Sequence, residues 1–378
     1  MIRGHGGNVH EAARLLGCNV AEIVDASSNL NPLGPVPGLF TYLARRITEA
    51  ISLPEPDAQS AVRHVARWMG LSPKNLTMGN GTTQFIYAIP QALRIRNAMV
   101  MAPTYADYQD ACALVRVPVR CSFLDTARKF VPDLEKIRRK VRAVDVVFFC
   151  NPNNPTGVFT PSDTLADLVR SCPETLFVID ESYLPFCGPE KALSLAQQAL
   201  PNALILMSLS KMYALAGLRV GFVHGPLEIT EKLRSWCPPW SVNTLAAMAV
   251  EYLAENQDAA FAHAKETRAF CTHERDLWLK CFANDDRVRF YPGAATFLLG
   301  ELATGEAAAL CEHLRRCHIL VRDCSNFAGL SPAWFRVSMK GAEENIRLRW
   351  ELGEWLQATQ TSANSQTKKH KQHGQSTF

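Results

Sequence analysis

The sequence predicts an α/β protein: a large domain with a mainly parallel sheet flanked by helices, followed by a smaller α+β C-terminal domain. Two observations predict it. Short apolar runs, such as residues 144–150 and 176–179, alternate with amphipathic stretches, which is typical of parallel strands buried on both faces and joined by helices. After Asn243 the pattern changes to one long helical region, residues 244–282, and then to short strands, which indicates a second domain.

The apolar spacing predicts the elements in chain order. Helical spacing covers residues 37–50 and 58–70, and Pro54 and Pro56 interrupt between them. The further elements of the large domain are strands over residues 75–78, 98–102, 144–150, 176–179, 203–207 and 220–223, with a helix ending near Ala92. Those of the small domain are strands over residues 288–291, 296–299, 319–322 and 334–337, and helices over residues 306–316 and 343–356.

The domain organisation follows from length and composition. At 378 residues the chain exceeds what one hydrophobic core usually supports, so two domains are expected. The tail is polar, carries the basic run at residues 368–371 and has almost nothing to bury, which predicts disorder. We therefore expect an N-terminal arm (1–35), a large domain (36–243), a small domain (244–358) and a disordered tail (359–378). That the arm lies over the active site is implied only by the family resemblance given below.

Composition excludes several functional classes. The net charge of +4 without a basic stripe gives no reason to expect a nucleic-acid partner. No apolar run approaches the roughly 20 residues of a membrane span, and the amino terminus lacks a signal-peptide pattern, so we expect a cytoplasmic protein. The twelve cysteines include no C-x-x-C pair, and no histidine cluster has metal spacing. We expect reduced core thiols and no metal.

The residues with the clearest chemical signal lie between the two apolar runs that end at Met207 and begin at Val220. Ser208, Ser210 and Arg219 offer hydroxyl groups and a guanidinium fork, a donor set suited to a doubly charged phosphate. Lys211 lies among cations and apolar residues, which lower the pKa of an amine and favour its attack on an aldehyde. A lone lysine usually caps a turn, but a phosphate site beside an activated lysine suggests pyridoxal phosphate.

Two other motifs fall at the ends of buried strands. Asn151-Pro-Asn-Asn-Pro-Thr-Gly157 follows one strand, and Asp180-Glu-Ser-Tyr183 follows the next. Ligands of open α/β sheets bind at the carboxyl ends of the strands. We therefore expect Asn154, Asp180, Tyr183 and Lys211 to converge.

These motifs, in this order, resemble those of fold type I pyridoxal phosphate enzymes, specifically class I and II aminotransferases. The resemblance covers nearly the whole chain, up to about Gln357. It implies that Lys211 holds the cofactor and that Asp180 keeps the pyridine nitrogen protonated. It also implies that Asn154 and Tyr183 hydrogen-bond the ring oxygen.

The glycine-rich turn Met78-Gly-Asn-Gly-Thr-Thr-Gln84 precedes a helix and can present backbone N–H groups to an anion. The resemblance places the cofactor phosphate on Gly81 and Thr82. Tyr105 follows a strand, where it could simply be a core residue capping that strand. The resemblance instead has it cover the pyridine ring, since offset aromatic packing is favourable.

Two arginines of the second domain fall on predicted strands. Arg336 alternates with apolar residues, and an inward arginine needs an anion because it cannot lose its charge, although a surface ion pair is the commoner arrangement. The resemblance assigns the substrate carboxylate to Arg336. Arg322 then becomes a second anion site, which implies a substrate with two anionic groups.

Further segments resemble the threonine-phosphate decarboxylase family of cobalamin biosynthesis, close to the histidinol-phosphate aminotransferases. They are residues 5–8, 29–34 and 240–243, together with the segment around Arg322. This resemblance implies decarboxylation of O-phosphothreonine to aminopropanol phosphate, with O-phosphoserine as a second substrate. The implied substrate-binding residues are His5, Gly6, Asn29, Asn154, Arg322 and Arg336.

Two alternatives share the cofactor residues: a histidinol-phosphate aminotransferase and, more remotely, a non-catalytic pyridoxal phosphate-binding regulator. The resemblance also implies a homodimer. The chain departs from the family pattern at Leu53, where a tyrosine usually reaches the cofactor phosphate of the neighbouring subunit. One hydroxyl donor is therefore missing from that contact.

Overall fold

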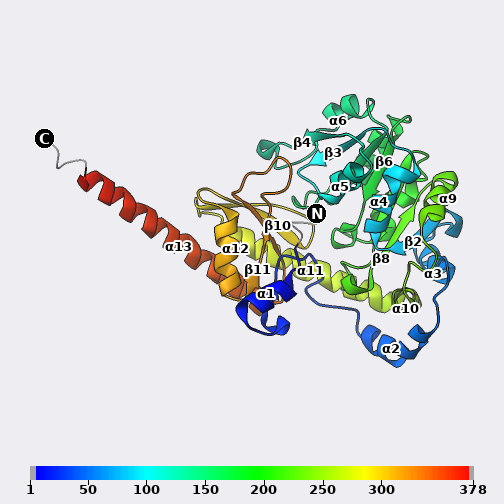
Figure 1. Cartoon of the computed structure of the whole chain (residues 1–378), viewed down its shortest axis with the longest axis horizontal. Coiled ribbons are helices and arrows are strands. Elements are labelled where there is room, and N and C mark those ends of the chain that lie inside the picture. Colours follow the sequence, from blue (N-terminus) through cyan, green and yellow to red (C-terminus); the bar gives the residue numbers. More distant parts are fainter. Residues whose placement is uncertain (1–5, 374–378) are drawn as a thin grey trace.

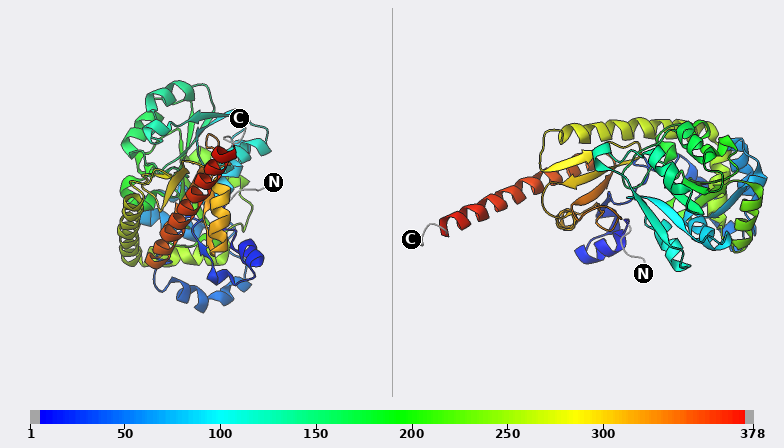
Figure 2. Two further views of the ribbon diagram at one scale, coloured as in Figure 1. Left: turned by 90° about the vertical axis from the view of Figure 1, so that its left-hand side faces the viewer. Right: turned by 90° about the horizontal axis from the view of Figure 1, so that it is seen from above.

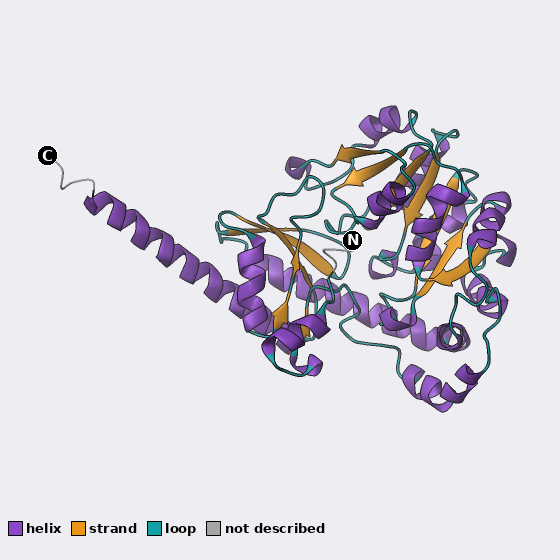
Figure 3. Cartoon of the chain, in the orientation of Figure 1, coloured by secondary structure: helices purple, strands orange, loops and turns teal. Residues whose placement is uncertain are grey.

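The computed structural model describes residues 6–373, and the side chains of residues 6–359. The large domain is built on a seven-stranded sheet with helices on both faces (Figure 1, Figure 3). In spatial order the strands are β2 (Leu76–Asn80), β8 (Val220–His224), β7 (Ala203–Ser208), β6 (Leu176–Asp180), β5 (Val146–Cys150), β3 (Ala98–Ala102) and β4 (Val119–Phe123). Strand β8 is antiparallel to both of its neighbours, and the other pairs are parallel, so the predicted mainly parallel sheet is confirmed.

Helices cover both faces of this sheet because its strands are apolar on both. Val146 and Phe148 belong to one buried cluster, whereas Val147 and Phe149 belong to the cluster on the opposite face. The helices of this domain are α2 (Leu39–Arg45), α3 (Gln59–Met69), α4 (Thr82–Ala92), α5 (Asp107–Leu114), α6 (Leu134–Val141), α7 (Ser162–Arg170), α8 (Glu190–Leu193), α9 (Leu227–Trp236) and α10 (Thr244–Glu255).

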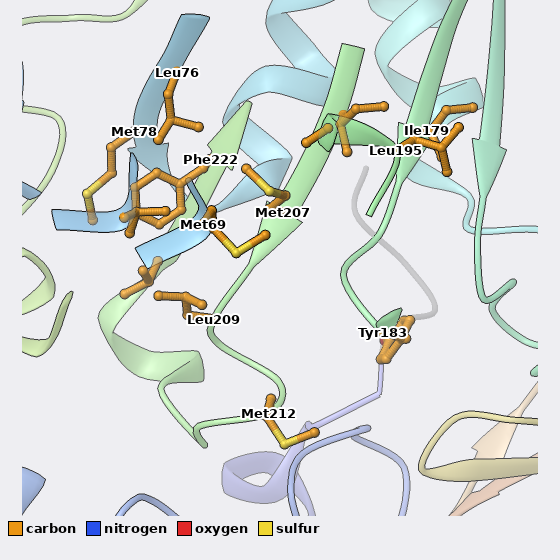
Figure 4. Close-up of a cluster of buried hydrophobic side chains, with 14 of the residues drawn as sticks. Met69, Leu76, Met78, Ile179, Tyr183, Leu195, Met207, Leu209, Met212 and Phe222 are labelled. Carbon is orange, nitrogen blue, oxygen red and sulfur yellow. The ribbon is translucent and has the colours of Figure 1, made fainter. Parts of the chain in front are cut away.

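One of these clusters supports the loop that follows β7. Met207, Leu209 and Met212 are buried there, and Figure 4 shows them in the same cluster of buried side chains as Phe222 of β8. The loop is therefore anchored by apolar side chains on both sides of residue 211. This anchoring places the polar residues of the loop at the end of the sheet.

The small domain has a four-stranded antiparallel sheet and its own hydrophobic cluster. Its strands are, in spatial order, β12 (Arg322–Asp323), β13 (Trp334–Ser338), β10 (Phe297–Leu302) and β9 (Val288–Tyr291). Its helices are α11 (Gln257–Cys281), α12 (Ala307–Arg316) and α13 (Ala342–His373). No helix in the described part of the chain is both long and apolar enough to span a membrane.

The structure differs from the expected domain limits at two places. Helix α10 packs against α3 and α2 and contributes to the large-domain cluster, although the sequence pattern placed it in the small domain. Helix α13 continues to His373 and projects from the body (Figure 1, Figure 2), where the composition predicted a disordered tail from residue 359. The segment contains neither glycine nor proline between Gly353 and Gly374, so nothing in its backbone terminates the helix earlier.

The N-terminal arm connects the two domains. Its helix α1 (Val9–Leu16) is followed by β1 (Val24–Asp25), which pairs in parallel with β11 (Ile319–Leu320) of the small domain. Further along, the Asn31 amide donates to Met212 O at 2.7 Å and to Thr267 Oγ1 at 2.8 Å, and Asn31 N donates to Lys211 O at 3.0 Å. The arm is thus fastened at one end to the small domain and at the other to the loop after β7.

We expect Asn31→Ala to lower the free energy of unfolding by about 2 kcal/mol, because the buried groups that its side chain bonds lose their partner. Urea denaturation followed by circular dichroism measures the change. Asn284→Ala is the matched control: Asn284 is exposed, and its replacement should stay within about 0.5 kcal/mol. Equal effects of the two substitutions would contradict an anchoring role for Asn31.

Candidate active site

A cavity of about 150 Å³ opens at the carboxyl ends of β5, β6 and β7, beside the start of α4. The structure brings all of the sequence-predicted cofactor residues to its wall. They are Gly81, Thr82, Tyr105, Asn154, Asp180, Tyr183, Ser208, Ser210, Lys211 and Arg219.

The anion cradle depends on two glycines. Gly81 is the N-cap residue of α4 with φ of 76°, a conformation that favours glycine. A Cβ on Gly81 would lie 2.8 Å from Arg219 Nη2, and a Cβ on Gly221 would lie 2.2 Å from Thr82 N. The glycines therefore let Arg219 and the first N–H groups of α4 surround one small space, which is suited to a phosphate.

The two serines hold the neighbouring loop. The hydroxyl groups of Ser208 and Ser210 donate to Val220 O at 3.3 and 3.0 Å, and Val220 N donates to Ser210 Oγ at 3.2 Å. These bonds fix the start of the loop to its end, next to Arg219. Both serines are buried and line the cavity.

The cavity makes Lys211 a stronger nucleophile than an ordinary lysine. Burial lowers the pKa of Lys211 to about 8, and the charges of Arg219 and Arg336 act in the same direction, while Asp180 opposes them. At pH 7 about a tenth of such an amine is neutral, compared with about four in ten thousand for a lysine of ordinary pKa. The uncharged form is the one that attacks a carbonyl.

Asp180 is oriented by a tyrosine that sequence reasoning missed. Tyr108 Oη donates to Asp180 Oδ2 at 2.7 Å, and Ser182 N donates to Asp180 Oδ1 at 3.0 Å. Tyr108 is fully buried and stacks on Phe148 with ring centroids 5.3 Å apart. Tyr105 precedes α5, which begins at Asp107, so helical spacing from Tyr105 gave no signal for Tyr108.

Tyr105 and Tyr183 provide aromatic walls. Tyr105 packs edge-on against Tyr108, with ring centroids 5.6 Å apart. Burial raises the pKa of Tyr183 to about 12, so this hydroxyl keeps its proton at neutral pH. Asn29 Nδ2 donates to Tyr183 Oη at 3.0 Å, and Ser338 Oγ donates to Asn29 Oδ1 at 2.5 Å. Asn29 therefore joins the large domain to the small one at the cavity.

Arg336 reaches the same place from β13. Its Nη1 donates to Asn154 Oδ1, and its Nη2 donates to Ser27 O at 2.6 Å. Arg336 Nε is buried and has no hydrogen-bond partner among the described side chains and backbone. This unsatisfied donor indicates that an anion or another acceptor belongs beside it.

Arg322 lies next to Arg336. The two residues are directly opposite each other on β12 and β13, so their side chains share a face. Arg322 Nη2 donates to Asn326 Oδ1 at 2.7 Å, and burial lowers the pKa of Arg322. Within residues 6–359, neither guanidinium forms an ion pair with a carboxylate. Two buried, adjacent cations without a counter-ion make a site for anionic groups.

The structure places the other described residues singled out by the sequence at varying distances from Arg322 and Arg336. A Cβ on Gly6 would lie 2.3 Å from Ser27 O, the same oxygen that Arg336 contacts, so the arm passes close to the arginine. His5 lies outside the described residues. Leu53, which stands where the family has tyrosine, is 75% exposed. Asn31, the second asparagine of residues 29–34, makes the anchoring contacts described above.

An activated lysine, a buried carboxylate, an aromatic wall and an anion cradle around one cavity define a pyridoxal phosphate-dependent enzyme. The donor set fits this cofactor: the cradle suits its phosphate, Lys211 its aldehyde and Asp180 its ring nitrogen. A family model described as aminotransferase class I and II matches residues 40–348, so the chain belongs to this family. The cofactor is pyridoxal 5'-phosphate, as predicted.

Three curated proteins illustrate the similarity. The chain is 30% identical to the threonine-phosphate decarboxylase of Salmonella typhimurium, over 91% of this chain and 94% of the relative. It is 30% identical to histidinol-phosphate aminotransferase 1 of Thiobacillus denitrificans, over 93% and 90% of the two chains. It is 29% identical to the adenosylcobalamin biosynthesis bifunctional protein CobDQ of Leptospira interrogans, over 91% of this chain but only 40% of that longer protein.

A solved structure confirms the fold. The crystal structure of L-threonine-O-3-phosphate decarboxylase from Porphyromonas gingivalis matches with a TM-score of 0.78 and 25% identity. The match covers 89% of this chain and 100% of that one. The predicted fold class and family resemblance are therefore both confirmed.

We expect Gly221→Ala to weaken pyridoxal phosphate binding at least about tenfold, because the new methyl group would displace the backbone of the cradle. Titration of the apoenzyme with cofactor, followed by absorbance, gives the dissociation constant. Gly353→Ala is the matched control, since no atom lies within 4 Å of a Cβ there. Unchanged affinity in Gly221→Ala would contradict the placement of the phosphate.

The lowered pKa of Lys211 predicts the pH dependence of cofactor capture. The rate at which the apoenzyme binds pyridoxal phosphate covalently should rise with pH with its midpoint at about 8, because only the neutral amine attacks. Rapid-mixing absorbance between pH 6 and 10 measures it, with Lys211→Ala as the blank and the exposed Lys191→Ala as the control. A midpoint near about 10.4, the ordinary lysine value, would contradict an activated amine.

Proposed function

We propose that this enzyme decarboxylates O-phospho-L-threonine to (R)-1-amino-2-propanol O-phosphate and carbon dioxide, for the nucleotide loop of cobalamin. The observation that carries the proposal is a pair of buried arginines without a carboxylate partner in the described structure: Arg336, which contacts Asn154 of the cavity wall, and Arg322 opposite it on the neighbouring strand. O-Phosphothreonine offers two anionic groups, a phosphate and a carboxylate, to these two cations. O-Phosphoserine differs by one methyl group and is proposed as a second substrate.

Bound pyridoxal phosphate would supply an electron sink for the bond that lies perpendicular to its ring at the α-carbon. The residues of the chain choose that bond. Arg336 would hold the carboxylate, Arg322 the phosphate, and Asn29 and Asn154 would limit how the substrate rotates between them. Lys211 Nζ would return a proton to the α-carbon. Each tenfold preference for decarboxylation needs only about 1.4 kcal/mol of selective stabilisation in the transition state.

The second candidate is a histidinol-phosphate aminotransferase, because relatives of that name are as similar as the decarboxylases. It would use the same cofactor residues and differ in which bond is broken. The two-cation site fits both reactions, because 2-oxoglutarate, the amino-group acceptor of the aminotransferase, also carries two anionic groups; the products of the two reactions distinguish them.

The test is carbon dioxide release from O-phosphothreonine and O-phosphoserine, with histidinol phosphate plus 2-oxoglutarate assayed for amino-group transfer. We expect release from a phosphorylated hydroxyamino acid, and its loss in Lys211→Ala. Glutamate formed from histidinol phosphate, without carbon dioxide from either phosphoamino acid, would establish the aminotransferase instead. Bound cofactor without either reaction would favour the non-catalytic regulator.

The two-anion site itself is tested by Arg322→Gln. We expect kcat/KM for O-phosphothreonine to fall by about 10- to 100-fold, the usual value of a charged hydrogen-bond pair, without loss of cofactor. Arg289→Gln is the matched control, because Arg289 is exposed on β9 of the same sheet. An unchanged kcat/KM in Arg322→Gln would place the phosphate elsewhere.

We further propose that the enzyme is a cytoplasmic homodimer. The apolar side chains of Ile51 and Leu53, in the segment before α3, are 88% and 75% exposed. Exposed apolar side chains of this kind are suited to burial against a second copy of the chain. Sedimentation of the holoenzyme at the mass of one chain would contradict this.

A further inference from the structure

Three side chains of types that can ligate a metal ion lie together outside the cavity, between α12 and α13. His313 and Cys317 are one helical turn apart at the end of α12, and Glu351 faces them from α13. One ligand atom of each residue lies within 4.8 Å of those of the other two. Glu351 is 34 residues beyond Cys317, so local spacing could not reveal the group, and the sequence predicted no metal site.

The separations are close to those of a tetrahedral zinc site. His313 Nε2 is 3.9 Å from Glu351 Oε2, and Cys317 Sγ is 3.3 Å from the same oxygen. With zinc at its usual distances of about 2.0 to 2.3 Å from nitrogen, oxygen and sulfur, tetrahedral ligands are about 3.3 to 3.7 Å apart. Small side-chain rotations would suffice to bring all three atoms to one ion.

The contacts within the described structure leave the group incompletely satisfied. His313 Nε2 is buried, yet it has no hydrogen-bond partner in the described part of the chain, and its distance to Glu351 is too long for a hydrogen bond. Cys317 closes α12 as its C-cap residue, where the negative end of the helix dipole favours a cation.

The nearby positive charges are engaged elsewhere. Arg315 and Arg316 both bond Glu312, on the outer side of α12, and Arg347 donates to the backbone oxygen of Cys317. The imidazole, thiol and carboxylate are thus left facing one another. A mixed nitrogen, sulfur and oxygen set of this kind suits Zn²⁺ better than Mg²⁺ or Ca²⁺, which prefer oxygen alone.

We propose that His313, Cys317 and Glu351 bind a structural Zn²⁺ that joins α12 to α13, with water as the fourth ligand. Cys317 is followed at once by β11 and then by β12, which begins with Arg322. The ion would therefore stabilise the segment that carries Arg322, the arginine opposite Arg336, without contacting the cavity. Ion binding adds to the stability of the folded state in proportion to the logarithm of ion concentration over its dissociation constant.

The test is titration of the metal-free, pyridoxal phosphate-loaded enzyme with Zn²⁺ in phosphate-free buffer. We expect one ion per chain, a dissociation constant of micromolar or below and a rise in Tm. Replacing zinc by Co²⁺ should give a thiolate-to-cobalt absorption band. In His313→Ala and Cys317→Ser, affinity should fall at least tenfold, and the cobalt band should vanish in Cys317→Ser.

Two controls separate this site from other thiols and histidines. Cys121→Ser changes a half-buried cysteine of the large domain and should leave binding unchanged. The double variant His370→Asn/His373→Asn removes the two C-terminal histidines and should also leave it unchanged. The proposal is overturned if the native enzyme binds no Zn²⁺ at concentrations of about 100 µM, or if binding persists in His313→Ala and Cys317→Ser but is lost in the C-terminal double variant.

Discussion

The hydrogen bonds of the N-terminal arm are the constraint on which the rest of the site depends. Asn29 joins Tyr183 of the large domain to Ser338 of the small domain, and two residues earlier Ser27 O accepts from Arg336. These groups are buried, so each must keep its partner or lose stability. The arm therefore fixes how the sheet of the small domain that carries Arg336 meets the loops of the large domain that line the cavity.

The charges at this junction explain its chemistry. Arg336 and Arg322 are adjacent and lack carboxylate partners within the described side chains, and Arg336 helps to lower the pKa of Lys211. Buried like charges are unfavourable until an anion binds between them. The same arrangement thus favours an anionic substrate and keeps a fraction of the lysine neutral for reaction with the cofactor.

Much of the cavity could be predicted because its residues follow strand ends. Asn154, Asp180 and Lys211 each come within four residues of the end of a buried apolar run, and such runs reveal both the strand and its end. Gly81 and Arg219 flank the same sheet and could be found from their motifs. Tyr108 could not be singled out, since its role depends on a hydrogen bond to Asp180 that no sequence spacing specifies.

Contacts between distant elements were also beyond sequence reasoning. Nothing in the sequence distinguishes Ser27 and Ser338 from other serines. Their roles arise only in the folded chain, where Ser27 O accepts from Arg336 and Ser338 donates to Asn29. The sequence also could not assign α10 to a domain. A helical pattern shows which face of the helix is apolar, but not which domain packs against that face. Helix α13 continues past residue 359 because no glycine or proline ends it there, and not because its apolar residues recur at helical spacing.

The most direct test of the account is a crystal structure of the Lys211→Ala enzyme with pyridoxal phosphate and O-phosphothreonine. The account predicts one substrate bound through both anions, its phosphate on Arg322 and its carboxylate on Arg336, beside a cofactor whose phosphate lies at the start of α4. A substrate phosphate remote from Arg322, or a carboxylate that makes no contact with Arg336, would contradict it.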